Sequence, residues 1–123
     1  GAGPPPRGAG PPPRGAYSAP VVPAEGDHIH EVLRDAGAKG RLRQFIAEAG
    51  GEEATLPRFS MSVCYYTRQV VAGTNYRVIV SVSRAAGSPH YQIDIFEPLP
   101  YLRKKPMLRG IEELGGTRRL QLI

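Results

Sequence analysis

Apolar and polar residues alternate along two stretches near the middle of the chain, residues 59–67 and residues 76–82. A period of two is typical of β-strands with one buried face. On the second stretch the apolar face carries Tyr76, Val78, Val80 and Val82. Between the stretches, Gly73 and Asn75 supply turn chemistry, because glycine adopts positive φ freely and asparagine tolerates it better than most residues. We therefore predict a β-hairpin with residues 69–73 at its tip.

Before the hairpin, the apolar spacing changes to that of amphipathic helices. Two sets of residues follow the i, i+3, i+4, i+7 pattern: Ile29, Val32, Leu33 and Ala36, then Leu42, Phe45, Ile46 and Ala49. At ~100° per residue the two sets would face nearly opposite sides of one straight helix. Gly37 and Gly40 lie between them. We predict one kinked helix or two short helices over residues 27–49, with Asp27 as N-cap and Gly50 as part of the stop signal.

After the hairpin, residues 91–96 alternate again, with Tyr91, Ile93 and Ile95 on one face. Residues 97–116 are rich in proline and basic residues, and we predict a loop there. Leu120 and Leu122 indicate a short last strand. A helical segment followed by antiparallel strands defines the α+β class. We expect the helical segment to pack on a wrapped four- to five-stranded antiparallel sheet.

The first 23 residues are of low complexity, because Gly-Ala-Gly-Pro-Pro-Pro-Arg occurs twice in tandem there. Proline lacks a backbone donor and glycine resists ordering, so this composition cannot build a core. We predict a disordered tail over residues 1–14 and one domain over residues 15–123. The domain is long enough for a single modest core.

Composition and charge narrow the function classes. The net charge of +5 fits an acidic partner, nucleic acid or a solvated basic surface. No apolar run approaches the ~20 residues of a membrane-spanning helix. The single cysteine, Cys64, excludes an intrachain disulfide and favours a reducing compartment such as the cytoplasm. Secretion stays open as an alternative, because the chain does not begin with Met.

Few residues suggest catalysis or metal binding. Cys64 lies within a predicted strand, so we interpret it as a partly buried thiol rather than a nucleophile. His28 and His30 are two positions apart at a helix start and should point to different sides. Tyr65 and Tyr66 could stack nucleobases, but no basic strip accompanies them in the sequence. We expect no enzyme activity, no cofactor, no metal, no nucleic-acid partner and no membrane partner.

The sequence Gln-Val-Val-Ala-Gly at residues 69–73, followed by Thr-Asn-Tyr, resembles the first inhibitory loop of the cystatins. Cystatins bind papain-like cysteine proteases. Leu99-Pro100, directly after the predicted strand at residues 91–96, resembles the second loop of the stefins, which are type 1 cystatins and usually lack disulfides. Gly15, ahead of the first helix, is similar in position to their trunk glycine. Gly10 is an upstream alternative that fits less well.

This resemblance implies a cystatin-like fold and a reversible, tight-binding inhibitor of papain-like cysteine proteases such as cathepsins. Such inhibitors fill the active-site cleft with an N-terminal trunk and two loops and form no covalent bond. The protease-binding residues that the resemblance implies are Gly15, Gln69, Val70, Val71, Ala72, Gly73, Leu99 and Pro100. The alternative is a non-inhibitory cystatin-fold module that binds partners through its basic surface or its proline-rich tail.

We expect a monomer that can also form a domain-swapped dimer. The reason is that β-branched Val70 and Val71 prefer extended geometry and are poorly suited to a tight turn. Opening the hairpin would relieve that strain, while the strand contacts stay the same in both forms.

Overall fold

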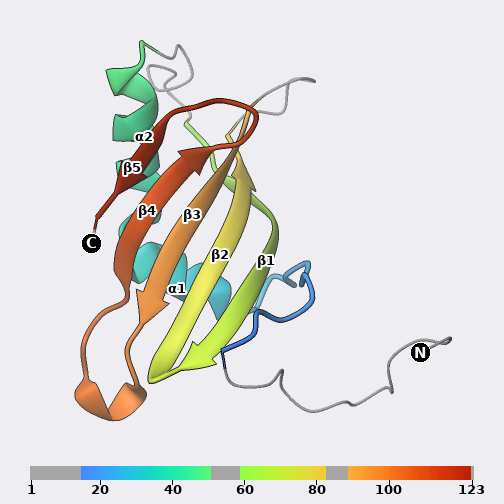
Figure 1. The fold of residues 1–123 in the computed structure, drawn as a ribbon, viewed down its shortest axis with the longest axis vertical. Helices are drawn as coiled ribbons and strands as arrows, with labels where there is room; N and C mark the ends of the chain where they lie inside the picture. The colour runs from blue at the N-terminus through green and yellow to red at the C-terminus, as the bar shows by residue number, and fades with distance from the viewer. Residues whose placement is uncertain (1–14, 51–58, 83–88, 123) are drawn as a thin grey trace, which may run out of the picture.

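The structure is a computed structural model that describes residues 15–50, 59–82 and 89–122. Two helices come first, α1 (Ile29–Asp35) and α2 (Ala38–Glu48). The strands follow in the order β1 (Ser62–Val71), β2 (Gly73–Ser81), β3 (His90–Glu97), β4 (Met107–Glu113) and β5 (Arg119–Gln121), with a short 3₁₀ turn, η2 (Pro100–Leu102), between β3 and β4. Both helices cover the same face of the sheet (Figure 1). The predicted α+β class is therefore confirmed, whereas the predicted tail at residues 1–14 lies outside the described residues.

The sheet has five strands, and its spatial order is the chain order β1-β2-β3-β4-β5. Every neighbouring pair is antiparallel; β2 and β3, for example, place Val78 opposite Ile93. The alternation in the sequence therefore gives the inner faces of these two central strands correctly, although Ile79 on the other face of β2 is also buried. Their buried inner faces carry Tyr76, Val78 and Val80 on β2 and Tyr91, Ile93 and Ile95 on β3.

The prediction of a loop over residues 97–116 is wrong in its second half, where β4 pairs with β3. The strand carries little alternation because Met107 and Arg109 are exposed and only Ile111 is a fully buried large side chain. Gly110 in its interior has no side chain to contribute, and an added Cβ there would lie 2.8 Å from the Leu120 carbonyl oxygen. The close approach of β5 explains this glycine. Pairing with β3 thus defines the strand more than its own pattern does.

The predicted break in the helical segment is confirmed and gives two separate helices. Gly37 lies between them with φ of 66°, in the left-handed region that glycine enters most readily. Helix α1 begins one residue later than predicted, and His28 holds the N-cap position without a side-chain cap bond. Asp27 still contributes, because its carboxylate accepts the Ile29 backbone N–H at 2.9 Å and the Tyr66 hydroxyl at 2.9 Å. It thus joins the start of α1 to β1.

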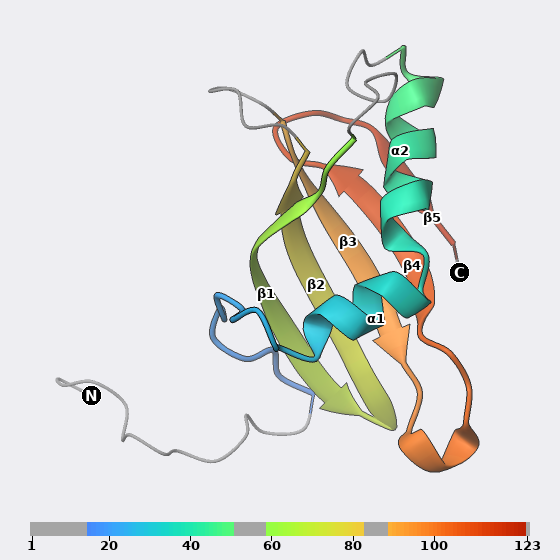
Figure 2. The same ribbon diagram turned by 180° about the vertical axis from the view of Figure 1, so that it is seen from behind.

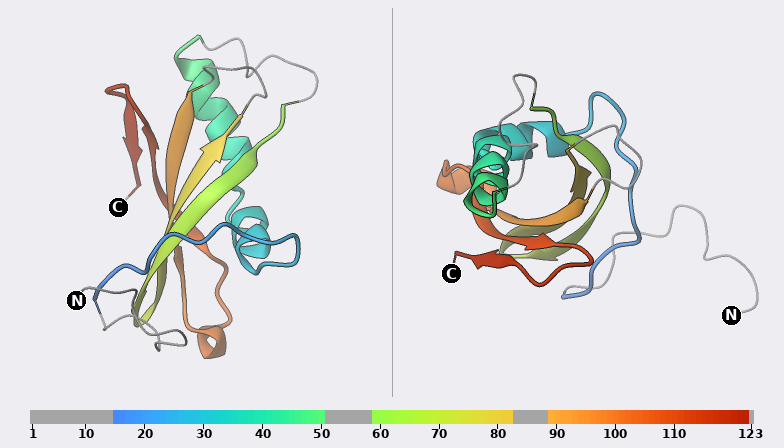
Figure 3. Two further views of the ribbon diagram at one scale, coloured as in Figure 1. Left: turned by 90° about the vertical axis from the view of Figure 1, so that its right-hand side faces the viewer. Right: turned by 90° about the horizontal axis from the view of Figure 1, so that it is seen from above.

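The core lies between the two helices and the concave face of the sheet. Figure 2 shows α1 crossing the strands while α2 runs along the β4 side, and Figure 3 shows the sheet curving around both. The largest fully buried side chains are Ile29, Leu42, Ile93, Ile95, Ile111, Val32, Val78 and Val80. Burying each of these side chains contributes about 1.5–3 kcal/mol. The helices and the concave face of the sheet are therefore held together by this apolar core.

Candidate protein-binding site

The turn between β1 and β2 is very short. Val71 pairs with Gly73, so Ala72 alone lies between the two strands. Gly73 has φ of 131°, and a Cβ at this position would lie 2.6 Å from the Glu97 carbonyl oxygen and 2.6 Å from the Phe96 ring. Both the backbone conformation and the close packing on β3 therefore require glycine.

The two valines of this segment lie in β1 and not in the turn. The prediction that residues 69–73 form the turn is therefore too broad, because the extended backbone that β-branched residues favour continues to Val71. The proposed cause of domain swapping, strain at Val70 and Val71, is wrong for the same reason. Val70 is 39% exposed and Val71 is half-buried. Val70 thus presents apolar surface to solvent near the end of the hairpin.

The N-terminal segment runs antiparallel to the outer edge of β1. Isolated bridges join Tyr17 to Gln69 and Val21 to Tyr66, and the Ser18 backbone N–H donates to the Arg68 carbonyl at 2.8 Å. The Gln69 side chain donates to the Gly15 carbonyl at 2.8 Å. Gly15 therefore lies beside Gln69 near the end of the hairpin, while Gly10 lies outside the described residues.

Gln69 also connects this segment to β2. Its side-chain carbonyl accepts a hydrogen bond from the Asn75 amide at 2.8 Å. Tyr17 packs nearby, with the Arg77 guanidinium carbon 4.0 Å from the centre of its ring. One glutamine side chain thus ties the N-terminal segment to both strands of the hairpin.

The connection between β3 and β4 contains Leu99 and Pro100 and lies at the same end of the molecule as the hairpin turn (Figure 1). Thr74 pairs with Glu97, so the chain leaves β3 directly beside the turn. Leu99 is half-buried and Pro100 is exposed. Beyond them, Tyr101 is 75% exposed and Leu102 is 45% exposed. Sequence reasoning missed these two apolar side chains. The signal that could have found them is their position between Leu99-Pro100 and a run of basic residues.

We call this end of the molecule the loop end and define it as residues 15–18, 69–75 and 98–106. All the protease-binding residues that the sequence predicted lie within it. Figure 3 (left) shows the three segments emerging at the same end of the domain. The loop end thus carries exposed large apolar side chains on two of its three segments, at Val70 and at Tyr101 and Leu102.

A hydrogen-bonded cluster supports the loop end from the concave side. Glu97, the last residue of β3, accepts from His28 at 2.7 Å and from the Tyr76 hydroxyl at 3.1 Å. His28 also contacts Glu31 at 3.1 Å through its other ring nitrogen. The hydrogen bond to Glu97 raises the pKa of His28, and burial raises the pKa of Tyr76. This cluster fixes the end of β3 to α1 and β2.

The other side chains that could act as nucleophiles or metal ligands do not lie close together in the described residues. Cys64 is half-buried at the bulge in β1. His30 contacts the Ala24 carbonyl at 2.9 Å, so its partner differs from those of His28. Within residues 15–50, 59–82 and 89–122 no group of three or more His, Cys, Asp or Glu side chains could hold a metal ion. No helix in the described part of the chain is long and apolar enough to cross a membrane.

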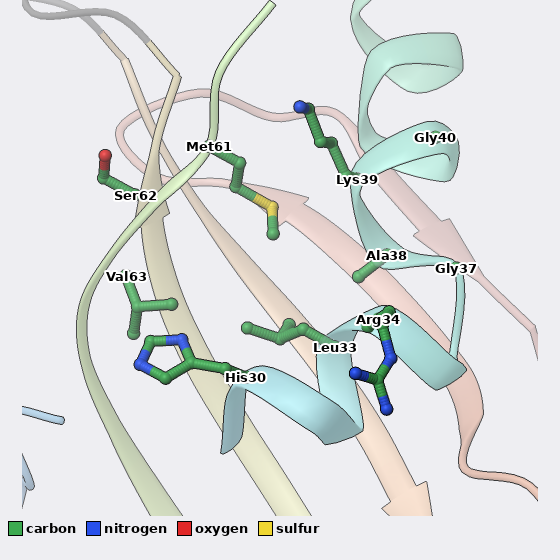
Figure 4. Close-up of a pocket in the computed structure, with 10 residues that line it drawn as sticks. All are labelled: His30, Leu33, Arg34, Gly37, Ala38, Lys39, Gly40, Met61, Ser62 and Val63. Carbon is green, nitrogen blue, oxygen red and sulfur yellow. The ribbon is translucent and has the colours of Figure 1, made fainter. Parts of the chain in front are cut away.

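A cavity of about 560 Å³ lies away from the loop end, between the two helices and the start of β1 (Figure 4). Its apolar lining comes from Leu33, Ala38, Met61 and Val63, and His30, Arg34 and Lys39 also line it. None of its lining residues belongs to the loop end, so the cavity plays no part in the site described above.

No protein-family model matches this chain, and a search of curated proteins finds no significant match. The resemblance to the cystatins therefore rests on the quoted motifs alone. The fold and the loop end together define an α+β protein in which three segments distant in the sequence lie at one end of an antiparallel sheet.

Proposed function

We propose that the protein is a reversible inhibitor of papain-like cysteine proteases with a cystatin-like fold. The observation that carries this proposal is the meeting of three distant segments at the loop end: the stretch from Gly15, the β1–β2 turn and the chain after Glu97. These are the segments that carry the cystatin-like motifs. A narrow row of projecting segments is the shape needed to fill a cleft.

The physical basis of inhibition is apolar contact by a rigid edge. Val70 and Leu102 are exposed in the free protein, and their burial in a cleft would contribute favourable apolar area. Gln69 and the hydrogen bonds along β1 hold the N-terminal segment in place before binding. Little conformational entropy is then lost on association. The protease is blocked by occupancy of its cleft, and no covalent step is needed.

The test is titration of active papain with the purified chain, comparing two substitutions of the same kind. Val70→Asp puts a carboxylate on the loop end. Val22→Asp is the matched control, because Val22 is 79% exposed and lies outside the loop end. Burying an unpaired charge costs several kcal/mol, so we expect Val70→Asp to raise the inhibition constant by roughly 100-fold or more. Val22→Asp should leave the constant unchanged.

Two results would contradict the proposal. One is a folded wild-type chain that does not inhibit papain or related cathepsins. The other is equal inhibition by the two valine variants. The first result would favour a cystatin-fold module that binds partners without inhibiting proteases.

A further inference from the structure

A run of positive charge occupies the β3–β4 connection at the loop end. Arg103, Lys104 and Lys105 are consecutive and all exposed. Arg103 has φ of 52°, and its backbone N–H closes η2 by donating to the Pro100 carbonyl at 3.1 Å. None of the three side chains forms an ion pair or a hydrogen bond with another described residue. Their charge is therefore available to a partner.

Three other arginines on the same sheet each contact an aromatic ring or a carboxylate. The guanidinium of Arg77 stacks on Tyr17 at 4.0 Å and that of Arg109 lies 5.5 Å from the centre of the Phe96 ring. Arg119 pairs with Glu112 at 3.2 Å. Glu97, the nearest acidic residue along the chain, is engaged by His28 and Tyr76. The β3–β4 connection thus holds three consecutive exposed charges, and the nearest carboxylate along the chain already has hydrogen-bond partners.

This concentration of charge favours a protein partner. Strong nucleic-acid binding rests on many phosphate contacts, on the order of 6–10, whereas three consecutive side chains on one loop can supply few of them. The basic run follows the exposed pair Tyr101 and Leu102. Apolar anchors bordered by charged residues are typical of a protein interface, in which the polar rim guides encounter and the apolar centre provides affinity.

Resting on the proposed inhibitory function, we propose that Arg103, Lys104 and Lys105 select acidic target proteases. The favoured targets carry carboxylates on the rim of the cleft beside the position of the β3–β4 connection. The selection acts mainly on the association rate constant, because long-range attraction accelerates encounter more than it slows dissociation. Proteases with a basic rim at this position associate more slowly with the same inhibitor.

The test measures association and dissociation rate constants for two papain-like proteases, one acidic and one basic at this rim. The loop variant is Lys104→Glu with Lys105→Glu. The matched control is Lys39→Glu with Arg41→Glu, which changes the net charge equally at exposed positions of α2, away from the loop end (Figure 2). All four positions are exposed, so the melting temperatures of both doubles should stay close to that of the wild type.

We expect the loop variant to lower the association rate constant for the acidic protease by roughly 10-fold or more at low salt. The dissociation rate constant should change little, and the control should have a much smaller effect. The difference should vanish near 1 M salt, where the Debye length is about 3 Å. For the basic protease, the loop variant should associate faster than the wild type.

Several outcomes would overturn the proposal. If both doubles slow association equally, only the overall charge matters. If inhibition is normal and indifferent to both changes, the charge selection fails while the inhibitory function stands; absence of any inhibition by the wild type rejects both. Binding to phosphatidylserine vesicles that is lost in the loop variant, with unchanged protease kinetics, would assign the loop to a membrane surface instead.

Discussion

The β1–β2 hairpin has two halves in which the same residue type meets opposite environments. Val78 is fully buried beneath the helices, whereas Val70 is 39% exposed beyond them. In the covered half, stability comes from side chains packed in the core. In the projecting half, the backbone restricts which residue can be present, because position 73 packs so closely against Glu97 and Phe96 that only glycine fits. Folding therefore explains the valines of the covered half but not the exposed valine at the loop end.

The largest expected effect tests the backbone of the projecting half. Gly73→Ala places a Cβ against the Glu97 carbonyl oxygen at an unfavourable φ of 131°. Strain and overpacking together should lower the free energy of unfolding by roughly 2–4 kcal/mol. Gly115→Ala is the control, because φ is 79° there but nothing lies within 4 Å of the added Cβ. Its cost should be only about 1–2 kcal/mol.

Urea unfolding of both glycine variants measures the difference. Equal losses at the two glycines would show that backbone conformation alone matters and that the contact with β3 does not. A loss at Gly73 below that at Gly115 would contradict the packing of the turn against β3.

A second prediction compares the two valines directly. Val78→Ala removes two methyl groups from the core and leaves a cavity, so the free energy of unfolding should fall by about 2–3 kcal/mol. Val70→Ala should cost about 0.5 kcal/mol or less, because Val70 is 39% exposed and its truncation leaves no enclosed cavity. Chemical denaturation followed by circular dichroism measures both values. Similar losses of unfolding free energy would mean that Val70 stabilises the fold as a core residue does, which contradicts its assignment to a partner-binding surface.

The covered half of the hairpin could be predicted from the sequence because one buried face imposes a period of two. The same argument explains β3, where Tyr91, Ile93 and Ile95 alternate with polar residues. It fails for β4, whose exposed Met107 and interior Gly110 weaken the pattern. Strand β4 forms because its backbone can hydrogen-bond to the free edge of β3, and this pairing joins residues far apart in the sequence.

In the candidate site, too, some features could be predicted from the sequence and others could not. Glycine and asparagine locate the turn, and local motifs identify Leu99 and Pro100. The exposure of Tyr101 could not be read from sequence, because it depends on the direction in which the chain leaves β3. The pairing of His28 with Glu97 joins residues 69 positions apart, and no local signal indicates such a contact.

The smallest predicted effect tests this pairing, which connects α1 to the end of β3. A neutral imidazole has one N–H, whereas protonated His28 can donate to both Glu31 and Glu97. The pKa of His28 is raised above 6.5 in the folded state, first by the hydrogen bond to Glu97. The stabilising effect of protonated His28 is therefore full below about pH 6.5 and is lost as the pH rises through the folded-state pKa.

Melting temperatures of the wild type and of His28→Gln should differ most below pH 6.5 and converge above the folded-state pKa of His28. His30→Gln is the control, because His30 contacts a backbone carbonyl. A difference between wild type and His28→Gln that is constant with pH, or one that His30→Gln reproduces, would show that the charge on His28 does not hold the end of β3.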